Sequence, residues 1–120
     1  MLENNKCILA YGLSKLELEK LKKLEYKIIE VTPEMCEMTL KDILSGIRLN
    51  VINTNPIKEK AIIYNSFFEF EMKDVIRETR NIVKNGVLAM VTSTSVEWKF
   101  NYLIKHLIEE REWYLKNRKE

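Results

Sequence analysis

Glycine, proline, cysteine and histidine are all scarce in this chain. Its 120 residues include three glycines, two prolines, two cysteines and one histidine. The phosphate-binding motifs G-x-x-x-x-G-K-[ST] and G-x-G-x-x-G are absent, and so is the nucleophile motif G-x-S-x-G. We therefore expect no cofactor and no catalytic residue that a known motif would supply.

The two cysteines, Cys7 and Cys36, form neither a C-x-x-C motif nor a zinc-binding spacing. We expect two free thiols, because a reducing cytoplasm disfavours the alternative, a Cys7–Cys36 disulfide. No metal site is expected. The one histidine, His106, has Glu109 and Glu110 nearby, but a helical H-x-x-E pattern alone is a poor metal signal.

Long apolar runs and an excess of one charge are also missing. No run approaches the about 18 apolar residues of a membrane span, and residues 1–6 lack the features of a signal peptide. Twenty Lys and Arg against eighteen Asp and Glu give a net charge of +2. This balance makes no electrostatic case for nucleic acid or for an anionic membrane. We expect a cytoplasmic protein that binds neither.

Four short apolar runs have the length and the β-branched or aromatic content of strands. The first, third and fourth are nearly continuous in apolar residues, which is typical of strands covered on both faces of a parallel sheet. Lys27 and Glu30 interrupt the second run, which predicts an edge strand. The runs are Cys7–Tyr11, Tyr26–Val31, Ala61–Tyr64 and Val87–Thr92.

Amphipathic helical periods follow each of these runs. N-cap spacings precede all four periods, and Gly86 is placed as the left-handed C-cap of the third. The apolar stripe of the third period runs from Phe68 to Val83. The fourth helix is predicted over about residues 95–117. The cap pairs are Ser14 with Glu17, Thr39 with Asp42, Ser66 with Glu69, and Thr94 with Glu97.

Strand and helix thus alternate four times, which predicts one α/β domain over residues 1–120 with two or three layers. We expect four mainly parallel strands in the order 2-1-3-4, with one antiparallel strand as an alternative. A strand, a serine, a helix and a strand ending in Val-Thr recur at residues 8–32 and 61–93. We interpret this as the usual arrangement of a βαβ unit, with duplication as the other interpretation. Residues 48–60 predict a loop, either a surface excursion or a functional segment.

Polar side chains follow all four predicted strands. In parallel sheets, ligands bind beyond the carboxyl ends of the strands, where helix N-termini suit an anion. These residues therefore form a candidate ligand site, although helix capping alone also explains them. They are Tyr11, Gly12, Ser14, Thr32, Tyr64, Asn65, Ser66, Thr92, Ser93, Thr94 and Ser95.

Aromatic residues at two places predict a contact surface for a partner. Trp113 and Tyr114 lie near the end of the long fourth helix, among charged residues, and Trp and Tyr are favoured at interfaces. Phe67 and Phe70 lie off the core stripe of the third helix. Packing of the tail aromatics back onto the domain is the alternative. His106 lies about three turns into the helix, too far from the hydroxyl-bearing strand ends for a catalytic pair.

Two segments resemble a family of small, uncharacterised bacterial proteins that carry a domain of unknown function. The segments are Tyr26–Leu44 (YKIIEVTPEMCEMTLKDIL) and Val91–Glu112 (VTSTSVEWKFNYLIKHLIEERE). The resemblance implies no activity and no site residues. From the residues themselves we expect a non-enzymatic binding or regulatory module. The alternatives are a small enzyme or sensor for an anionic metabolite at the strand ends, and a homodimer formed through the last helix.

Overall fold

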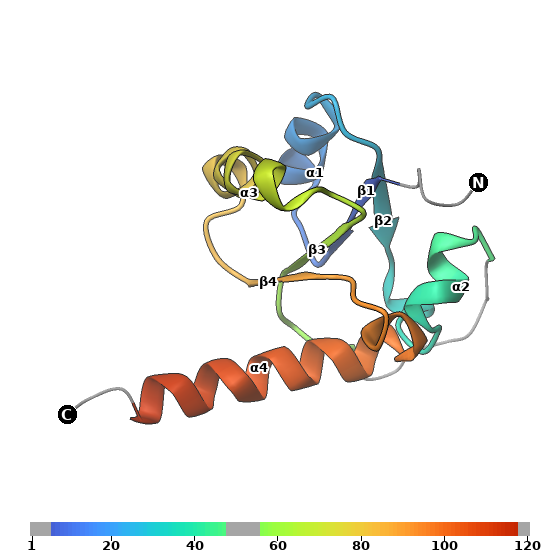
Figure 1. Ribbon diagram of the computed structural model, residues 1–120, viewed down its shortest axis with the longest axis vertical. Coiled ribbons are helices and arrows are strands. Elements are labelled where there is room, and N and C mark those ends of the chain that lie inside the picture. The colour runs from blue at the N-terminus through green and yellow to red at the C-terminus, as the bar shows by residue number, and fades with distance from the viewer. Residues whose placement is uncertain (1–5, 48–55, 118–120) are drawn as a thin grey trace.

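A computed structural model describes residues 6–47 and 56–117 of the chain (Figure 1). Within these two ranges, four strands, four α-helices and two 3₁₀ turns follow one another. In order they are β1 (Cys7–Tyr11), α1 (Lys15–Lys22), β2 (Ile28–Val31), η2 (Pro33–Met35), α2 (Leu40–Leu44), β3 (Ala61–Asn65), α3 (Glu69–Ile82), β4 (Val87–Met90), η3 (Ser95–Glu97) and α4 (Phe100–Asn117).

The strands form one mixed sheet in the order β2-β1-β3-β4, which is the predicted order. β1 pairs in parallel with β2, and β3 with β4, but the central strands β1 and β3 are antiparallel. The prediction of a mainly parallel sheet is therefore only partly right. β1 and β3 are buried along their whole length, and a strand covered on both faces is apolar throughout whichever way it runs. The sequence of such a strand therefore does not indicate whether the strand runs parallel or antiparallel to its neighbours.

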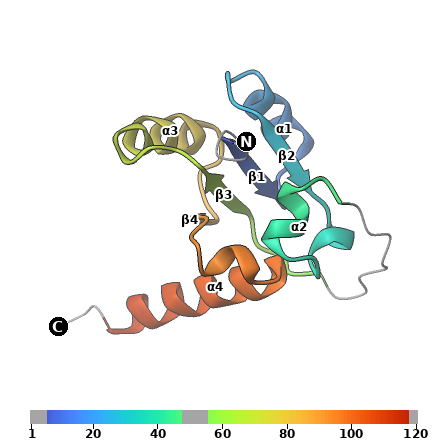
Figure 2. The same cartoon turned by 45° about the vertical axis from the view of Figure 1, so that its right-hand side comes forward.

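The sheet lies between two helical layers (Figures 1 and 2). α1 and α3 cover one face, and Met72 and Val75 of α3 share a buried apolar cluster with Ile8, Ile62 and Tyr64 of the sheet. α2, α4 and the 3₁₀ turns cover the other face and pack on Leu9 and Ile63. Of the two arrangements considered from the sequence, the three-layer one is observed.

The first two helices begin where their caps predict. Ser14 Oγ accepts from the N–H of Glu17 at 3.1 Å, and the Glu17 carboxylate accepts from the N–H of Ser14 at 2.9 Å. Thr39 Oγ1 accepts from the N–H of Asp42 at 3.1 Å. In both cases a side-chain oxygen satisfies a backbone donor at the helix start, which is the role the spacing predicted.

The predicted starts of the last two helices are wrong. Ser66 has a left-handed backbone (φ 67°), and the N-cap of α3 is Phe68, whose N–H donates to Glu71. Phe68 therefore leaves the core stripe and is exposed, while Phe67 is buried. Residues 95–97 form the separate turn η3, and α4 begins only at Phe100. Lys99 between them bridges to Thr39, and this tertiary pairing breaks the helix that local periodicity predicts.

Most of the loop predicted at residues 48–60 lies outside the described residues. Its described end, 56–60, makes several tertiary contacts, and two of them join it to β1 and α1. The Ile57 carbonyl accepts from the Tyr11 hydroxyl at 2.7 Å, and Lys60 pairs with Glu17 at 2.8 Å. In the described part of the chain, 6–47 and 56–117, no helix is long and apolar enough to cross a bilayer.

Candidate functional site

The predicted strand-end residues divide into two groups at opposite ends of the sheet. Because β1 and β3 are antiparallel, Tyr11 lies beside Ala61, and Asn65 lies beside Cys7. One end therefore carries Tyr11, Gly12, Ser14 and Thr32. The other end carries Tyr64, Asn65, Ser66, Thr92, Ser93, Thr94 and Ser95. The structure does not bring the two groups into one site.

The first group borders a cavity of about 290 Å³, whose lining includes Tyr11, Gly12, Thr32 and Glu30. The Tyr11 hydroxyl is already donated to Ile57. Burial, together with the neighbouring Cys36 thiol, raises the pKa of Tyr11 to about 12. Tyr11 thus stays neutral and holds the segment that leads into β3, rather than offering a charged or free group to the cavity.

The second group is largely used in internal hydrogen bonds. The Tyr64 hydroxyl lies 2.6 Å from Thr79 Oγ1, within the layer between β3 and α3. Thr92 and Ser95 bond each other reciprocally, the N–H of each donating to the hydroxyl of the other at 3.0 and 2.9 Å. These bonds close the turn that leads into η3. Ser93 and Thr94 are exposed.

The thiols are free, as predicted, and both are buried. Burial raises the pKa of Cys7, and it raises the pKa of Cys36 to about 11. Both thiols are therefore protonated at neutral pH, and a thiol is a far weaker nucleophile than a thiolate. Among the described residues no group of three or more His, Cys, Asp or Glu side chains is arranged to hold a metal ion.

His106 belongs to an aromatic cluster on the exposed side of α4. Its ring centroid lies 5.4 Å from that of Trp98 and 6.3 Å from that of Tyr102. Its Nε2 atom is 3.3 Å from the carboxylate of Glu110, one turn further along the helix. These neighbours are the ones expected of a surface helix position.

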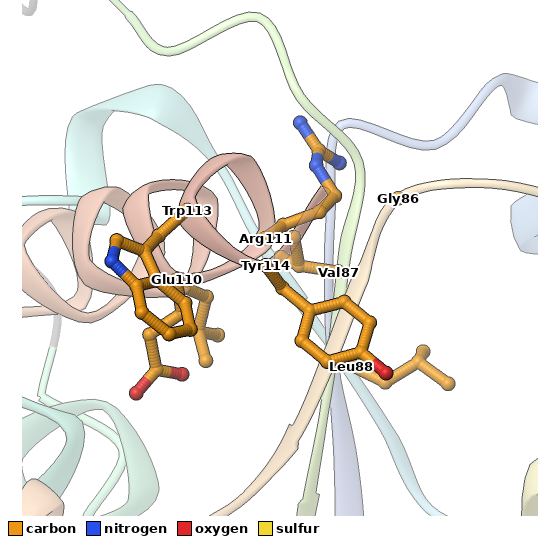
Figure 3. A pocket seen from close by; sticks show the side chains of 8 residues that line it. Gly86, Val87, Leu88, Glu110, Arg111, Trp113 and Tyr114 are labelled. Atoms are coloured by element: carbon orange, nitrogen blue, oxygen red, sulfur yellow. The ribbon is translucent and has the colours of Figure 1, made fainter. Parts of the chain in front are cut away.

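A groove with a volume of about 600 Å³ lies between β4 and the second half of α4 (Figure 3). Its walls are mainly apolar. We call it the β4–α4 groove; it is lined by Gly86, Val87, Leu88, Leu107, Glu110, Arg111, Trp113 and Tyr114.

One ion pair anchors α4 at this groove. Arg111 donates two hydrogen bonds to the Glu59 carboxylate, at 2.9 and 3.1 Å. These bonds lower the pKa of Glu59. The C-terminal end of α4 continues past the edge of the sheet (Figures 1 and 2), and this tail exposes 65% of Trp113 and 61% of Tyr114.

β4 is an edge strand whose outer side is open. The N–H groups of Val87 and Val91 donate inward, to Lys60 and Tyr64 of the β3 side. Strand residues alternate, so the backbone groups of Leu88 and Met90 point outward, away from β3. The strand has no charged residue, whereas the opposite edge strand, β2, carries the exposed Glu30.

The aromatic prediction at α3 changes in detail. Phe67 is buried and packs edge-on against Tyr26 and Tyr64. Phe70 is 80% exposed, and its stacked partner is Phe68. Sequence reasoning also missed Leu88 and Met90, although the absence of charge in the last apolar run was a usable signal.

Residues 60–114 match the model of a domain of unknown function. The match contains the segment Val91–Glu112, one of the two on which the resemblance rests, and excludes Tyr26–Leu44. The bacterial distribution of that family remains an expectation. No curated protein and no solved structure matches the chain. The stretch from the residue before β3 to near the end of α4 is thus similar to DUF3783, a domain of unknown function, and the match spans less than half of the chain.

Proposed function

We propose that this chain is a non-enzymatic binding module that associates with a second copy of itself through the β4–α4 groove and the open edge of β4. The observation that carries the proposal is the conjunction of three features at one place. An uncharged edge strand, an apolar groove and an exposed aromatic helix tail adjoin one another.

The open edge favours an extended strand as the occupant. Outward N–H and C=O groups on an uncharged edge are a template for strand addition. Proteins block such edges with charge where pairing is unwanted. Glu30 is placed to do so on β2, and β4 has no equivalent residue.

A second copy satisfies both the edge and the helix tail. If two β4 strands pair antiparallel about a two-fold axis, each α4 tail extends over the sheet of the other copy. The tail from Leu107 to Asn117 spans about 15 Å, which corresponds to roughly three strand spacings. Trp113 and Tyr114 would then lie at the β4–α4 groove of the other copy, and the same surface would serve both partners, as a two-fold interface requires.

Sedimentation velocity at high micromolar concentration tests this proposal. We expect the wild-type chain to be a dimer of 14.3 kDa protomers. Met90→Lys and Trp113→Ala should each weaken the dimer by at least about tenfold, roughly 1.4 kcal/mol. Met90 is 45% exposed, so its substitution spares the core. Phe70→Ala, on α3, is the matched control and should leave the dimer intact. A wild-type chain that stays monomeric would rule the proposal out.

A second candidate is a sensor of an anionic metabolite. The cavity of about 290 Å³ at the ends of β1 and β2 is the observation that favours it, since α1 begins nearby and a helix N-terminus attracts anions. The Glu30 carboxylate in the cavity lining opposes it. A saturable rise of the melting temperature with inorganic phosphate, lost in Thr32→Val, would favour this candidate. No shift would remove it.

A further inference from the structure

The two halves of the chain are built alike. Each follows the order strand, helix, strand, 3₁₀ turn, helix. We call residues 6–47 the first unit and residues 60–117 the second unit. Equivalent details recur at equivalent places: a left-handed residue follows the first strand of each unit, Gly12 with φ 77° and Ser66 with φ 67°. An N-cap then donates its N–H to a glutamate three residues on, Ser14 to Glu17 and Phe68 to Glu71.

Contacts between the units are reciprocal. Lys6 pairs with Glu71 at 2.7 Å, and Lys60, the equivalent of Lys6, pairs with Glu17 at 2.8 Å. Each pair therefore joins the lysine of one unit to the glutamate of the other. In a two-fold interface residue i contacts j′ and residue j contacts i′, and this exchange is what the two ion pairs display.

The second helices of the units show the same exchange. The N–H of Leu40 donates to the Trp98 carbonyl at 2.9 Å, and the N–H of Phe100 donates to the Met38 carbonyl at 2.8 Å. Thr39 and Lys99 face each other between these two bonds. On the outside, Asn101 binds Glu37 at 3.1 Å, and the equivalent pair is Lys41 with Glu97 at 3.9 Å.

The sheet register gives the position of the axis. Leu9 pairs with Ile63, and each is the central residue of its strand. Cys7 and Tyr11 at the ends of β1 pair with Asn65 and Ala61 at the ends of β3. A local two-fold axis thus runs between Leu9 and Ile63 on the sheet, and between Thr39 and Lys99 below it.

We propose that the surface of the second unit that contacts the first unit is a homotypic interface. The partner that this surface fits is another copy of the second unit. This chain is then a covalently fused dimer, in which residues 6–47 are a divergent copy of the unit to which the domain of unknown function corresponds.

The second unit carries the chemistry for pairing with itself. Ile63 would meet Ile63 of the other copy on the axis, in place of Leu9. Lys60 would meet the other copy's Glu71, in place of Glu17, so both ion pairs survive. Ile62 would stand in place of Ile8, and Tyr64 would replace the much smaller Ala10 opposite β3. That overpacking makes self-pairing of the second unit weaker than its pairing with the first unit. In the intact chain the second unit therefore pairs with the first.

The first test keeps every interface residue. A protease site is inserted between residues 48 and 55 of the full chain, the folded protein is cut, and the two pieces are unfolded and refolded together with a molar excess of the second piece, because pairing with the first unit is the stronger of the two. Native mass spectrometry should find the complex of first and second units together with a pair of second units. A refolded mixture that contains only the complex of unlike units would overturn the proposal.

The second test places a reporter cysteine at position 99, on the proposed two-fold axis. In the full chain, Leu9→Asp disables the first unit, and Lys99→Cys reports on the axis. Cys7→Ala and Cys36→Ala remove the native thiols, and Met90→Lys blocks the edge of β4. Oxidation should link two chains through position 99, with retained amide protection in β3, α3 and β4. The link should be absent when Leu9 is intact, because Thr39 then occupies the position opposite Lys99.

A matched control moves the reporter to Lys105→Cys, an exposed position on α4 away from the axis. It should give no link. Equal linkage at both positions, or loss of amide protection throughout the second unit, would contradict the proposal. Because Met90→Lys is present in every variant of this second test, its result is independent of the dimer proposed at the β4–α4 groove.

Discussion

Arg111 and Glu59 tie the middle of α4 to the segment that enters β3, through two parallel hydrogen bonds of 2.9 and 3.1 Å. The residues are far apart in sequence, and their side chains are 37% and 21% exposed. Bidentate Arg–carboxylate geometry is the arrangement in which a partly exposed ion pair contributes measurable stability. The pair holds one wall of the β4–α4 groove in place.

We expect Glu59→Gln to lower the free energy of unfolding by about 1 kcal/mol at neutral pH. The pKa of Glu59 is lowered from 4.5 by Arg111, so its contribution is present above that value and is lost as the pH falls through the folded-state pKa. Urea titrations at neutral and acidic pH measure this. A wild-type advantage that persists unchanged at low pH would contradict the assignment.

Cys36 should resist thiol reagents in the folded protein. Its side chain is buried and its pKa is raised to about 11, so almost no thiolate forms at pH 8. A chromogenic disulfide reagent should react with both cysteines only after unfolding. Because the pKa is raised, the associated stability is present below 9, the unfolded value, and is lost as the pH rises towards 11. Fast reaction of the native protein would refute this account.

Gly86→Ala should destabilise the protein clearly more than Gly46→Ala. Both glycines have a positive φ, 101° and 84°, so both substitutions carry backbone strain of about 1 kcal/mol. A Cβ on Gly86 would also lie 2.5 Å from the Lys60 carbonyl oxygen, while a Cβ on Gly46 meets nothing within 4 Å. The difference in melting temperature between the two variants measures the effect of the contact between the new Cβ and the Lys60 carbonyl. Equal losses of stability would show that this contact does not destabilise the protein.

A disulfide should form between Thr39→Cys and Lys99→Cys within one chain. The two residues are a directly opposed antiparallel pair flanked by hydrogen bonds, which corresponds to a Cα separation of about 4.5 Å. Closing the long loop between them should add roughly 2–4 kcal/mol of stability. Non-reducing mass analysis and a denaturant melt test this. Lys41→Cys with Lys99→Cys serves as a mismatched control that should stay reduced.

Capping residues and strand composition predicted much of the local structure. Ser14, Glu17 and Thr39 act within one helical turn, so their spacing alone set the starts of α1 and α2. The apolar runs identified all four strands. Prediction failed at Phe68 and at the start of α4, where a left-handed Ser66 and the pairing of Lys99 with Thr39 overrode the local pattern. Both effects depend on the rest of the fold.

The candidate site shows the same division. Sequence alone indicated the polar strand ends and the aromatic tail, because residue types and period are local properties. Only the tertiary structure decided that β1 and β3 run antiparallel, since a strand buried on both faces is apolar in either direction. That single choice separated Tyr11 from Asn65 and set the two halves about a common axis.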